Sequence, residues 1–165
     1  MQRQLSVLLL TWIGWSMSAN SQMQSPVETK TQPSSQIVFV CEHGAALSVV
    51  SAAYFNKIAK EEHLNLHAIA RGTEPQKDLS VSAREGLKSD GVPFDSTRPR
   101  RLSSKDAADA RRIVTFTSLP AKYSSLAPIE KWTDVPPIAD GYERARDAIL
   151  KHLRELIRQL KFEGR

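Results

Sequence analysis

The residues best suited to chemistry lie between Cys41 and Ser48. Cys41 is the only cysteine of the chain, and it follows an apolar run, Ile37–Val40. After it come a glycine at position 44 and small, helix-forming residues. A buried strand that ends at a cysteine and turns through a glycine loop into a helix forms an anion site, because loop N–H groups and the helix dipole favour negative charge. A thiolate in that field is a nucleophile.

Alternating strands and helices are predicted around this stretch. The apolar patterns indicate strands at residues 37–40, 66–70, 112–117 and 129–132, and helices at residues 45–61, 80–89, 103–110 and 140–160. Ser103 is a predicted N-cap, Gly91 a predicted C-cap, and Asp140 with Glu143 a predicted capping box. This order predicts an α/β fold with three layers, in which helices cover both faces of a four-stranded parallel sheet.

Four residues directly follow a predicted strand, and ligands bind at the carboxyl ends of parallel strands. We therefore expect these residues to face one crevice: Cys41, Arg71, Ser118 and Asp134.

The N-terminus has the three-part pattern of a secretory signal peptide at residues 1–21. Arg3 precedes an apolar stretch at residues 5–15, and small polar residues follow, with cleavage expected after Ala19 or Ser21. The stretch is shorter than the ~20 residues that span a bilayer. Export to the periplasm or medium is the prediction; an uncleaved N-terminal anchor is the alternative. Residues 22–36 are rich in Ser, Gln, Thr and Pro, which predicts a disordered linker.

The net charge is +5, but aromatic residues do not alternate with the basic ones, and no nucleic-acid-reading motif accompanies them. A solvated basic face is therefore preferred over nucleic-acid binding. A single cysteine in an exported chain cannot form an internal disulfide, so Cys41 is either a reactive thiol or paired with another molecule. The histidines show no metal-ligand spacing with Cys41 or with one another, and no metal or cofactor is assigned. The oligomeric state is not predicted.

Three features together resemble the low-molecular-weight phosphotyrosine phosphatase superfamily, whose relatives include thioredoxin-coupled arsenate reductases. They are the strand–cysteine–loop–helix of residues 37–48, the turn Ala70–Thr73 after the second strand, and Trp132 with Asp134 before the last helix. The resemblance covers residues 37–160 and implies a phosphatase-like domain with these bounds. Within the superfamily, the chain looks like a member of a divergent bacterial branch.

The resemblance implies a role for each matching residue. Cys41 matches the nucleophile and Asp134 the general acid, although Val135 separates it from the proline that follows the acid in the family. The residues matching the phosphate-binding loop are Glu42, His43, Gly44, Ala45, Ala46, Leu47 and Ser48. Ser48 matches a hydroxyl that hydrogen-bonds the thiolate. Leu47 departs from the pattern, because the family has its oxyanion-clamping arginine there.

Two side chains are open to opposing interpretations. Arg71 replaces the missing cation if it reaches the crevice, or else is a surface arginine. His43 is a cation or acid beside bound phosphate, or else faces solvent.

The implied reaction is phosphomonoester hydrolysis through a cysteinyl-phosphate, with Asp134 protonating the leaving group and then activating water. The loss of arginine predicts weak activity and leaves a non-catalytic phosphate-binding protein as the alternative. A third possibility is arsenate reduction with an external thiol, since one cysteine cannot relay oxidation through others. The expected partner is a phosphate-bearing small molecule or phosphoprotein, with no membrane contact after cleavage.

Overall fold

A computed structural model describes residues 34–163 of the chain. The predicted signal peptide and the linker up to residue 33 lie outside the described residues. Ser34 and Ser35 lead into the first strand, which begins at Gln36, one residue before the predicted start. Within residues 34–163, no helix has both the length and the apolarity needed to cross a membrane.

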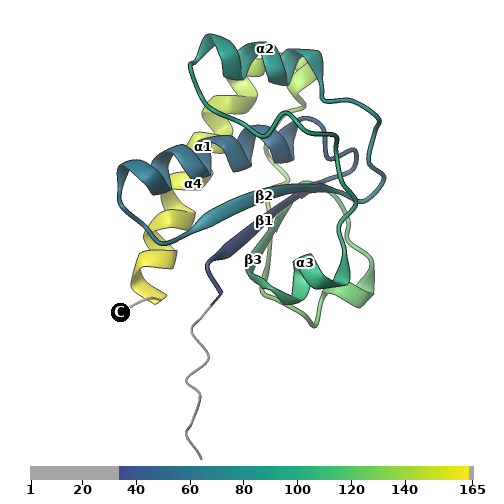
Figure 1. Cartoon of the computed structure of the whole chain (residues 1–165), viewed down its shortest axis with the longest axis vertical. Coiled ribbons are helices and arrows are strands. Elements are labelled where there is room, and N and C mark those ends of the chain that lie inside the picture. The colour runs from purple at the N-terminus through teal and green to yellow at the C-terminus, as the bar shows by residue number, and fades with distance from the viewer. Residues whose placement is uncertain (1–33, 164–165) are drawn as a thin grey trace, which may run out of the picture. The chain divides into compact units, whose positions relative to one another are not determined.

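Four parallel strands form one sheet in the order β2-β1-β3-β4. Figure 1 shows β2, β1 and β3 side by side in this order. The strands are β1 (Gln36–Cys41), β2 (His67–Gly72), β3 (Ala110–Thr115) and β4 (Ile129–Lys131). β1 is the central strand, and its run of Ile, Val, Phe and Val is fully buried on both faces, as apolar strands of parallel sheets are. Because β2 and β3 flank β1 on opposite sides, the carboxyl end of β1 is the switch point where such sheets bind ligands.

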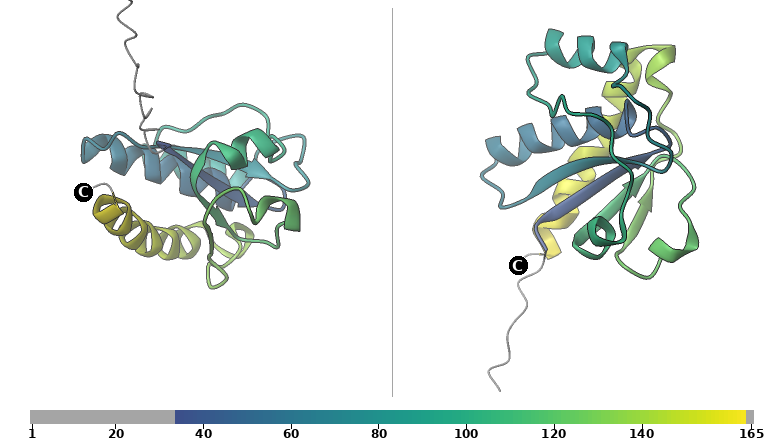
Figure 2. Two further views of the ribbon diagram at one scale, coloured as in Figure 1. Left: turned by 90° about the horizontal axis from the view of Figure 1, so that it is seen from below. Right: turned by 45° about the vertical axis from the view of Figure 1, so that its right-hand side comes forward.

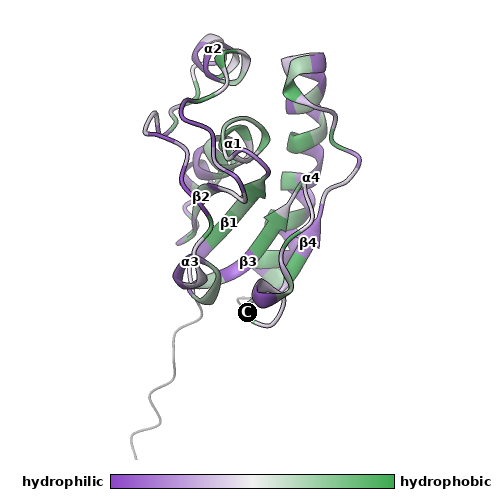
Figure 3. Cartoon of the chain, turned by 90° about the vertical axis from the view of Figure 1, so that its right-hand side faces the viewer, coloured by the Kyte–Doolittle hydropathy of each residue, from purple (hydrophilic) through white to green (hydrophobic). Residues whose placement is uncertain are grey.

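Helices cover both faces of the sheet, as predicted, and Figure 2 shows α1 and α4 together on one side of it. The helices are α1 (Leu47–Glu61), α2 (Val81–Ser89), α3 (Ser104–Ala108) and α4 (Tyr142–Glu163), with 3-10 turns η1 (Ala121–Tyr123) and η2 (Ile138–Asp140). On one face, Ile37 and Phe39 of β1 pack against α1 and α4. On the other, Val38 and Val40 pack against α3 and η1. In Figure 3, β1 is mostly hydrophobic, whereas β3 is hydrophilic at its start, around Arg111 and Arg112, and hydrophobic toward its carboxyl end.

Two predicted element boundaries differ from the structure in ways that matter for the site. β2 runs through Arg71 and Gly72, because the N–H of Gly72 donates to the Arg100 carbonyl and Cys41 pairs with Gly72 across the sheet. Arg71 is therefore a strand residue rather than the first residue of a loop. The last helix begins at Tyr142 instead of Asp140, because η2 occupies the predicted first turn.

Candidate functional site

Cys41 ends β1 beside the first turn of α1. Its side chain is almost fully buried, with 8% exposed, and its Sγ lies 3.1 Å from the Oγ of Ser48, which is itself fully buried. A serine hydroxyl at this distance can donate to a thiolate. The structure thus brings together the predicted nucleophile and its predicted hydroxyl partner.

The loop from Glu42 to Ala46 turns its carbonyls toward a second segment of the chain. The carbonyls of Cys41, Glu42, His43 and Ala45 accept hydrogen bonds from the N–H groups of Thr73, Glu74, Gln76 and Ser80 at 2.7–3.1 Å. No hydrogen bond within the described part of the chain uses the N–H of Glu42, His43, Gly44, Ala45 or Ala46. Ala46 is the N-cap of α1 and supplies no side-chain acceptor. The loop that follows Cys41 therefore has five N–H groups without a partner among the described residues, as an anion cradle requires.

Two glycines let this loop approach the sheet. Gly44 has a φ of +62°, and a Cβ there would lie 2.8 Å from the backbone nitrogen of Gly72. A Cβ on Gly72 would in turn lie 2.7 Å from the nitrogen of Gly44. Backbone therefore packs directly on backbone, and both positions require glycine.

A pocket of about 430 Å³ opens above Cys41. Of the predicted loop residues it is lined by Glu42, His43, Ala45, Ala46 and Leu47, whereas Gly44 and Ser48 are not part of its lining. The remaining lining comes from Gln76, Ser80, Phe116, Thr117, Pro137, Ile138 and Ala139. None of the described residues that line it is a lysine or an arginine. His43 is exposed, and its Nδ1 lies 3.4 Å from the Glu74 carbonyl oxygen.

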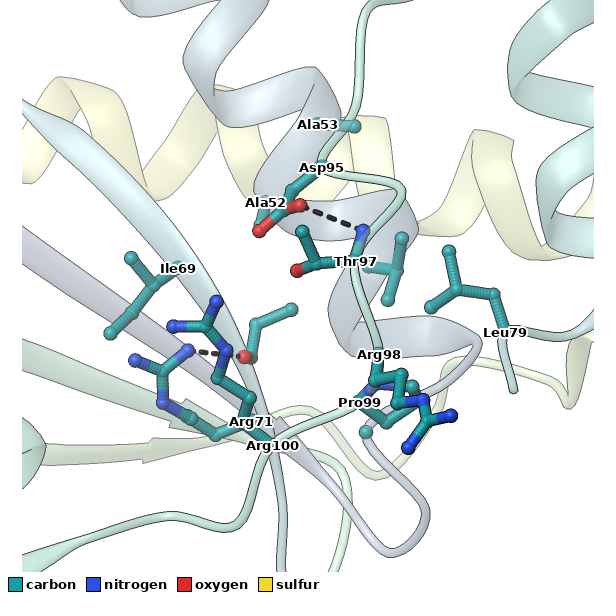
Figure 4. Close-up of a pocket in the computed structure, with 13 residues that line it drawn as sticks. Ala52, Ala53, Ile69, Arg71, Leu79, Asp95, Thr97, Arg98, Pro99 and Arg100 are labelled. Atoms are coloured by element: carbon teal, nitrogen blue, oxygen red, sulfur yellow. Dashed lines mark hydrogen bonds between the residues drawn. The ribbon is translucent and has the colours of Figure 1, made fainter. Parts of the chain in front are cut away.

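Arg71 does not line this pocket. In the β1–β2 register it pairs with Val40, so it points toward the α3 face of the sheet, where its Nε and Nη2 donate to the Asp106 carboxylate at 3.0 and 2.8 Å. It borders a separate pocket of about 60 Å³, beside Arg100 (Figure 4). Burial opposes ionisation of Asp106, but the hydrogen bonds from Arg71 and Ser103 outweigh it and lower the pKa of the carboxyl. Arg71 is thus a link between β2 and α3.

Asp134 also lies away from the lining of the Cys41 pocket. Its Oδ1 is 2.8 Å from the Nε2 of His152 on α4, and 69% of its side chain is exposed. The hydrogen bond with His152 lowers the pKa of Asp134. His152 stacks on the buried ring of Trp132, with ring centroids 4.7 Å apart. The part of this loop that reaches the pocket is Pro137–Ala139.

Sequence reasoning missed these lining residues: Gln76, Ser80, Phe116, Thr117 and Pro137–Ala139. Phe116 was predicted to be inside the third strand, yet β3 ends at Thr115 and Phe116 stands at the sheet's carboxyl edge. The signal available in the sequence was position alone, since the end of an apolar run adjoins the crevice. Ser118, predicted to face the crevice, is exposed and not part of the lining.

Comparison with known families assigns the fold. A protein-family model described as low molecular weight phosphotyrosine protein phosphatase matches residues 36–134, more than half of the chain. The chain belongs to this family. No match is found among curated proteins.

Solved structures agree with membership of the low molecular weight phosphatase family at the level of fold. YfkJ from Bacillus subtilis superposes with a TM-score of 0.72 at 18% identity, covering 82% of this chain and 99% of that one. A protein tyrosine phosphatase from Entamoeba histolytica, solved with Hepes in its active site, has a TM-score of 0.67, 20% identity and coverage of 80% and 100%. An arsenate reductase from Archaeoglobus fulgidus has a TM-score of 0.59, 25% identity and coverage of 73% and 98%.

Proposed function

We propose that this chain is an oxyanion-binding member of the phosphatase family whose phosphomonoester hydrolysis is weak or lost. The supporting observation is the contrast inside one pocket. The backbone cradle around Cys41 presents its N–H groups, while the described lining contains no arginine, lysine or aspartate. The ligand is a small oxyanion or a group carried by a larger molecule such as a phosphoprotein.

The size of the catalytic defect follows from the two missing groups. An arginine on a transferring phosphoryl group contributes on the order of 10³–10⁵ in rate. A positioned general acid contributes roughly 10²–10⁴. Backbone N–H groups still bind negative charge, so binding survives better than turnover.

A second candidate is cysteine-dependent hydrolysis at a low rate, which the Cys41–Ser48 hydrogen bond favours. In that reaction the Cys41 thiolate attacks phosphorus and the alcohol or phenol leaves with a proton. Water then attacks the cysteinyl-phosphate and releases phosphate and the thiol. Asp134 can protonate the leaving group only after it separates from His152 and the loop brings it to the pocket.

Arsenate reduction is the third possibility, since an arsenate reductase is among the structures that this fold resembles. With one cysteine, the electrons must come from external thiols: one attacks the sulfur of the Cys41–arsenate adduct, so that arsenite leaves and a mixed disulfide forms, and a second reduces that disulfide and frees Cys41.

One set of assays separates these functions. The purified chain and a Cys41→Ser variant are tested for phosphate binding by calorimetry, for aryl phosphate hydrolysis, and for arsenite production with added thiol. Phosphate or another oxyanion that binds without turnover supports the proposal. Hydrolysis at ordinary enzymatic rates that Cys41→Ser abolishes overturns it in favour of the second candidate. Thiol-dependent arsenite production favours the third.

A further inference from the structure

Three large apolar side chains line the Cys41 pocket, and one of them, Leu47, stands at the position that matches the family's arginine. Leu47 stands on the first turn of α1 and packs against the core cluster shared by α1 and α4. Phe116 faces the same pocket from the end of β3, and its ring meets that of Trp132 edge-on at 5.7 Å. Ile138, only 3% exposed, closes the third side. The space left by the arginine is therefore filled by a hydrophobic surface.

The charges around the pocket disfavour a doubly charged ligand. Glu42 lines the pocket together with Cys41, and the described lining residues include no lysine or arginine. The other lining side chain that can carry a charge is His43, which is exposed and has its Nδ1 3.4 Å from the Glu74 carbonyl oxygen. At neutral pH a phosphate monoester carries close to two negative charges, since its second pKa is about 6. The N-terminus of a helix offers the equivalent of about half a positive charge. A single negative charge matches that field, whereas a dianion beside the thiol is left largely uncompensated.

The size of the pocket indicates more than an inorganic ion. Its volume of about 430 Å³ lies in the range of small-molecule sites, roughly 300–1,000 Å³. An oxyanion on the loop N–H groups occupies only the base of this space. The upper part, between Leu47, Phe116 and Ile138, then accepts an apolar group of the same ligand.

We propose that the pocket over Cys41 binds a monoanionic organic acid, a carboxylate or sulfonate on an apolar body, in preference to a phosphate monoester. This rests on the proposed function, because the same N–H cradle holds the anionic group. The acid group lies on the loop N–H groups, and the apolar body packs against Leu47 and Phe116. Leu47 is then the residue that sets the preferred ligand charge.

The test uses Cys41 as its own reporter, because it is the only thiol in the chain. Protection of Cys41 from iodoacetamide is titrated at neutral pH with phenylacetate, benzenesulfonate, phenyl phosphate and inorganic phosphate, and calorimetry gives the affinities. We expect phenylacetate or benzenesulfonate to bind at least tenfold more tightly than phenyl phosphate. Leu47→Arg should reverse that order. Leu126→Arg adds the same charge at a side chain that is 38% exposed and outside the pocket lining, and should leave the order unchanged.

The outcomes distinguish this inference from the function beneath it. If phenyl phosphate binds the wild-type chain as tightly as the monoanions or more tightly, the inference is wrong while oxyanion binding stands. If none of the four probes binds or protects Cys41, both are wrong. The affinities of the four probes for the wild-type chain alone decide between these outcomes, so the test does not depend on whether Leu47→Arg folds.

Discussion

Two buried serines about one turn apart on α1 differ in their hydrogen-bond partners. Ser48 and Ser51 are both fully buried, but the Oγ of Ser48 meets the Cys41 sulfur, whereas the Oγ of Ser51 has no hydrogen-bond partner among the described residues. Most buried polar groups in proteins have a hydrogen-bond partner, so the Ser51 hydroxyl is an exception. The chain thus contains its own control for the hydroxyl that supports the thiolate.

Ser48→Ala should slow alkylation of Cys41 by iodoacetamide about tenfold or more, because a hydrogen bond to a charged group contributes roughly 1.5–3 kcal/mol. Ser51→Ala should leave the alkylation rate unchanged, since it removes a hydroxyl that contacts no reactive atom. The rate is followed by mass spectrometry of the singly labelled chain. Equal rates for Ser48→Ala and wild type would show that the hydroxyl does not support the thiolate.

Arg71 illustrates how a charged residue near a site can serve the fold instead. Its guanidinium and the Asp106 carboxylate are each only 16% exposed, and the carboxylate also accepts from the Ser103 N–H in the capping box of α3. Removal of the arginine leaves this carboxylate without its strongest partner.

Arg71→Ala should lower the free energy of unfolding at neutral pH by about 1.5–3 kcal/mol, the contribution of hydrogen bonds to a charged group. The pKa of Asp106 is lowered in the folded state, so this stability is present above the unfolded pKa and is lost as pH falls through the folded pKa. The gap between wild type and variant, measured by urea unfolding, should therefore close in acid.

Lys105→Ala is the matched control, because its pair with Asp109 on α3 is largely exposed and should contribute no measurable stability. Anion protection of Cys41 should be unchanged in Arg71→Ala. A loss of anion binding in a folded Arg71→Ala chain would instead assign Arg71 to the pocket.

At the scale of elements, the anion loop is held against β2 by backbone contact. Gly44 and Gly91 both have a φ near +62°, but only at Gly44 would a Cβ meet another chain segment; nothing lies within 4 Å at Gly91. Substitutions at Gly91 and Gly44 therefore distinguish two free-energy costs: that of a left-handed backbone alone, and that of also displacing the loop.

Gly91→Ala should destabilise the chain by about 1–2 kcal/mol, the strain of a left-handed residue, without affecting anion binding. Gly44→Ala should cost clearly more and abolish anion protection of Cys41, because the loop must move away from Gly72. Chemical unfolding and the alkylation assay measure the two effects. If Gly44→Ala matches Gly91→Ala in both measurements, backbone packing does not set the cradle's shape.

The sequence predicted the strand, the cysteine loop and the helix at this site because each depends on local pattern: a β-branched run, a glycine and a helical repeat. It could not predict where Arg71 and Asp134 point. The direction of Arg71 depends on register with β1, which is a tertiary property. Asp134 lies in an irregular segment, where no repeat fixes which side chains are buried: Val135 is buried, and the exposed Asp134 carboxylate meets His152. The sequence pattern gave no indication of that preference.

At the scale of the whole molecule, five segments converge on one pocket: the ends of β1 and β3, the N-terminus of α1, residues 76–80, and the loop before α4. The missing arginine belongs to the N-terminus of α1, and the missing acid belongs to the loop before α4. Pro137 lines the pocket and is the N-cap of η2, with φ −57° and ψ 143°. Aspartate is favoured at N-cap positions, so the loop can accept an acid there.

Leu47→Arg alone should raise aryl phosphate hydrolysis, and Leu47→Arg with Pro137→Asp should raise it by at least a further factor of ten, because one residue stabilises charge and the other transfers a proton. Initial rates of a chromogenic aryl phosphate measure this, and Cys41→Ser in the double variant should remove the gain. A double variant no faster than the single one would mean that position 137 does not reach the leaving group.

The hydrogen bonds from residues 73–80 to the anion loop also determine how the site opens. Four N–H groups of one segment, at Thr73, Glu74, Gln76 and Ser80, hold four consecutive or near-consecutive carbonyls of the loop. Breaking one of these hydrogen bonds strains the other three, so we expect residues 73–80 and the loop after Cys41 to separate in one step. In native-state hydrogen exchange, these four amides should share one opening free energy. A ligand on the cradle should slow exchange of all four amides by the same factor, because the four hydrogen bonds open in one step.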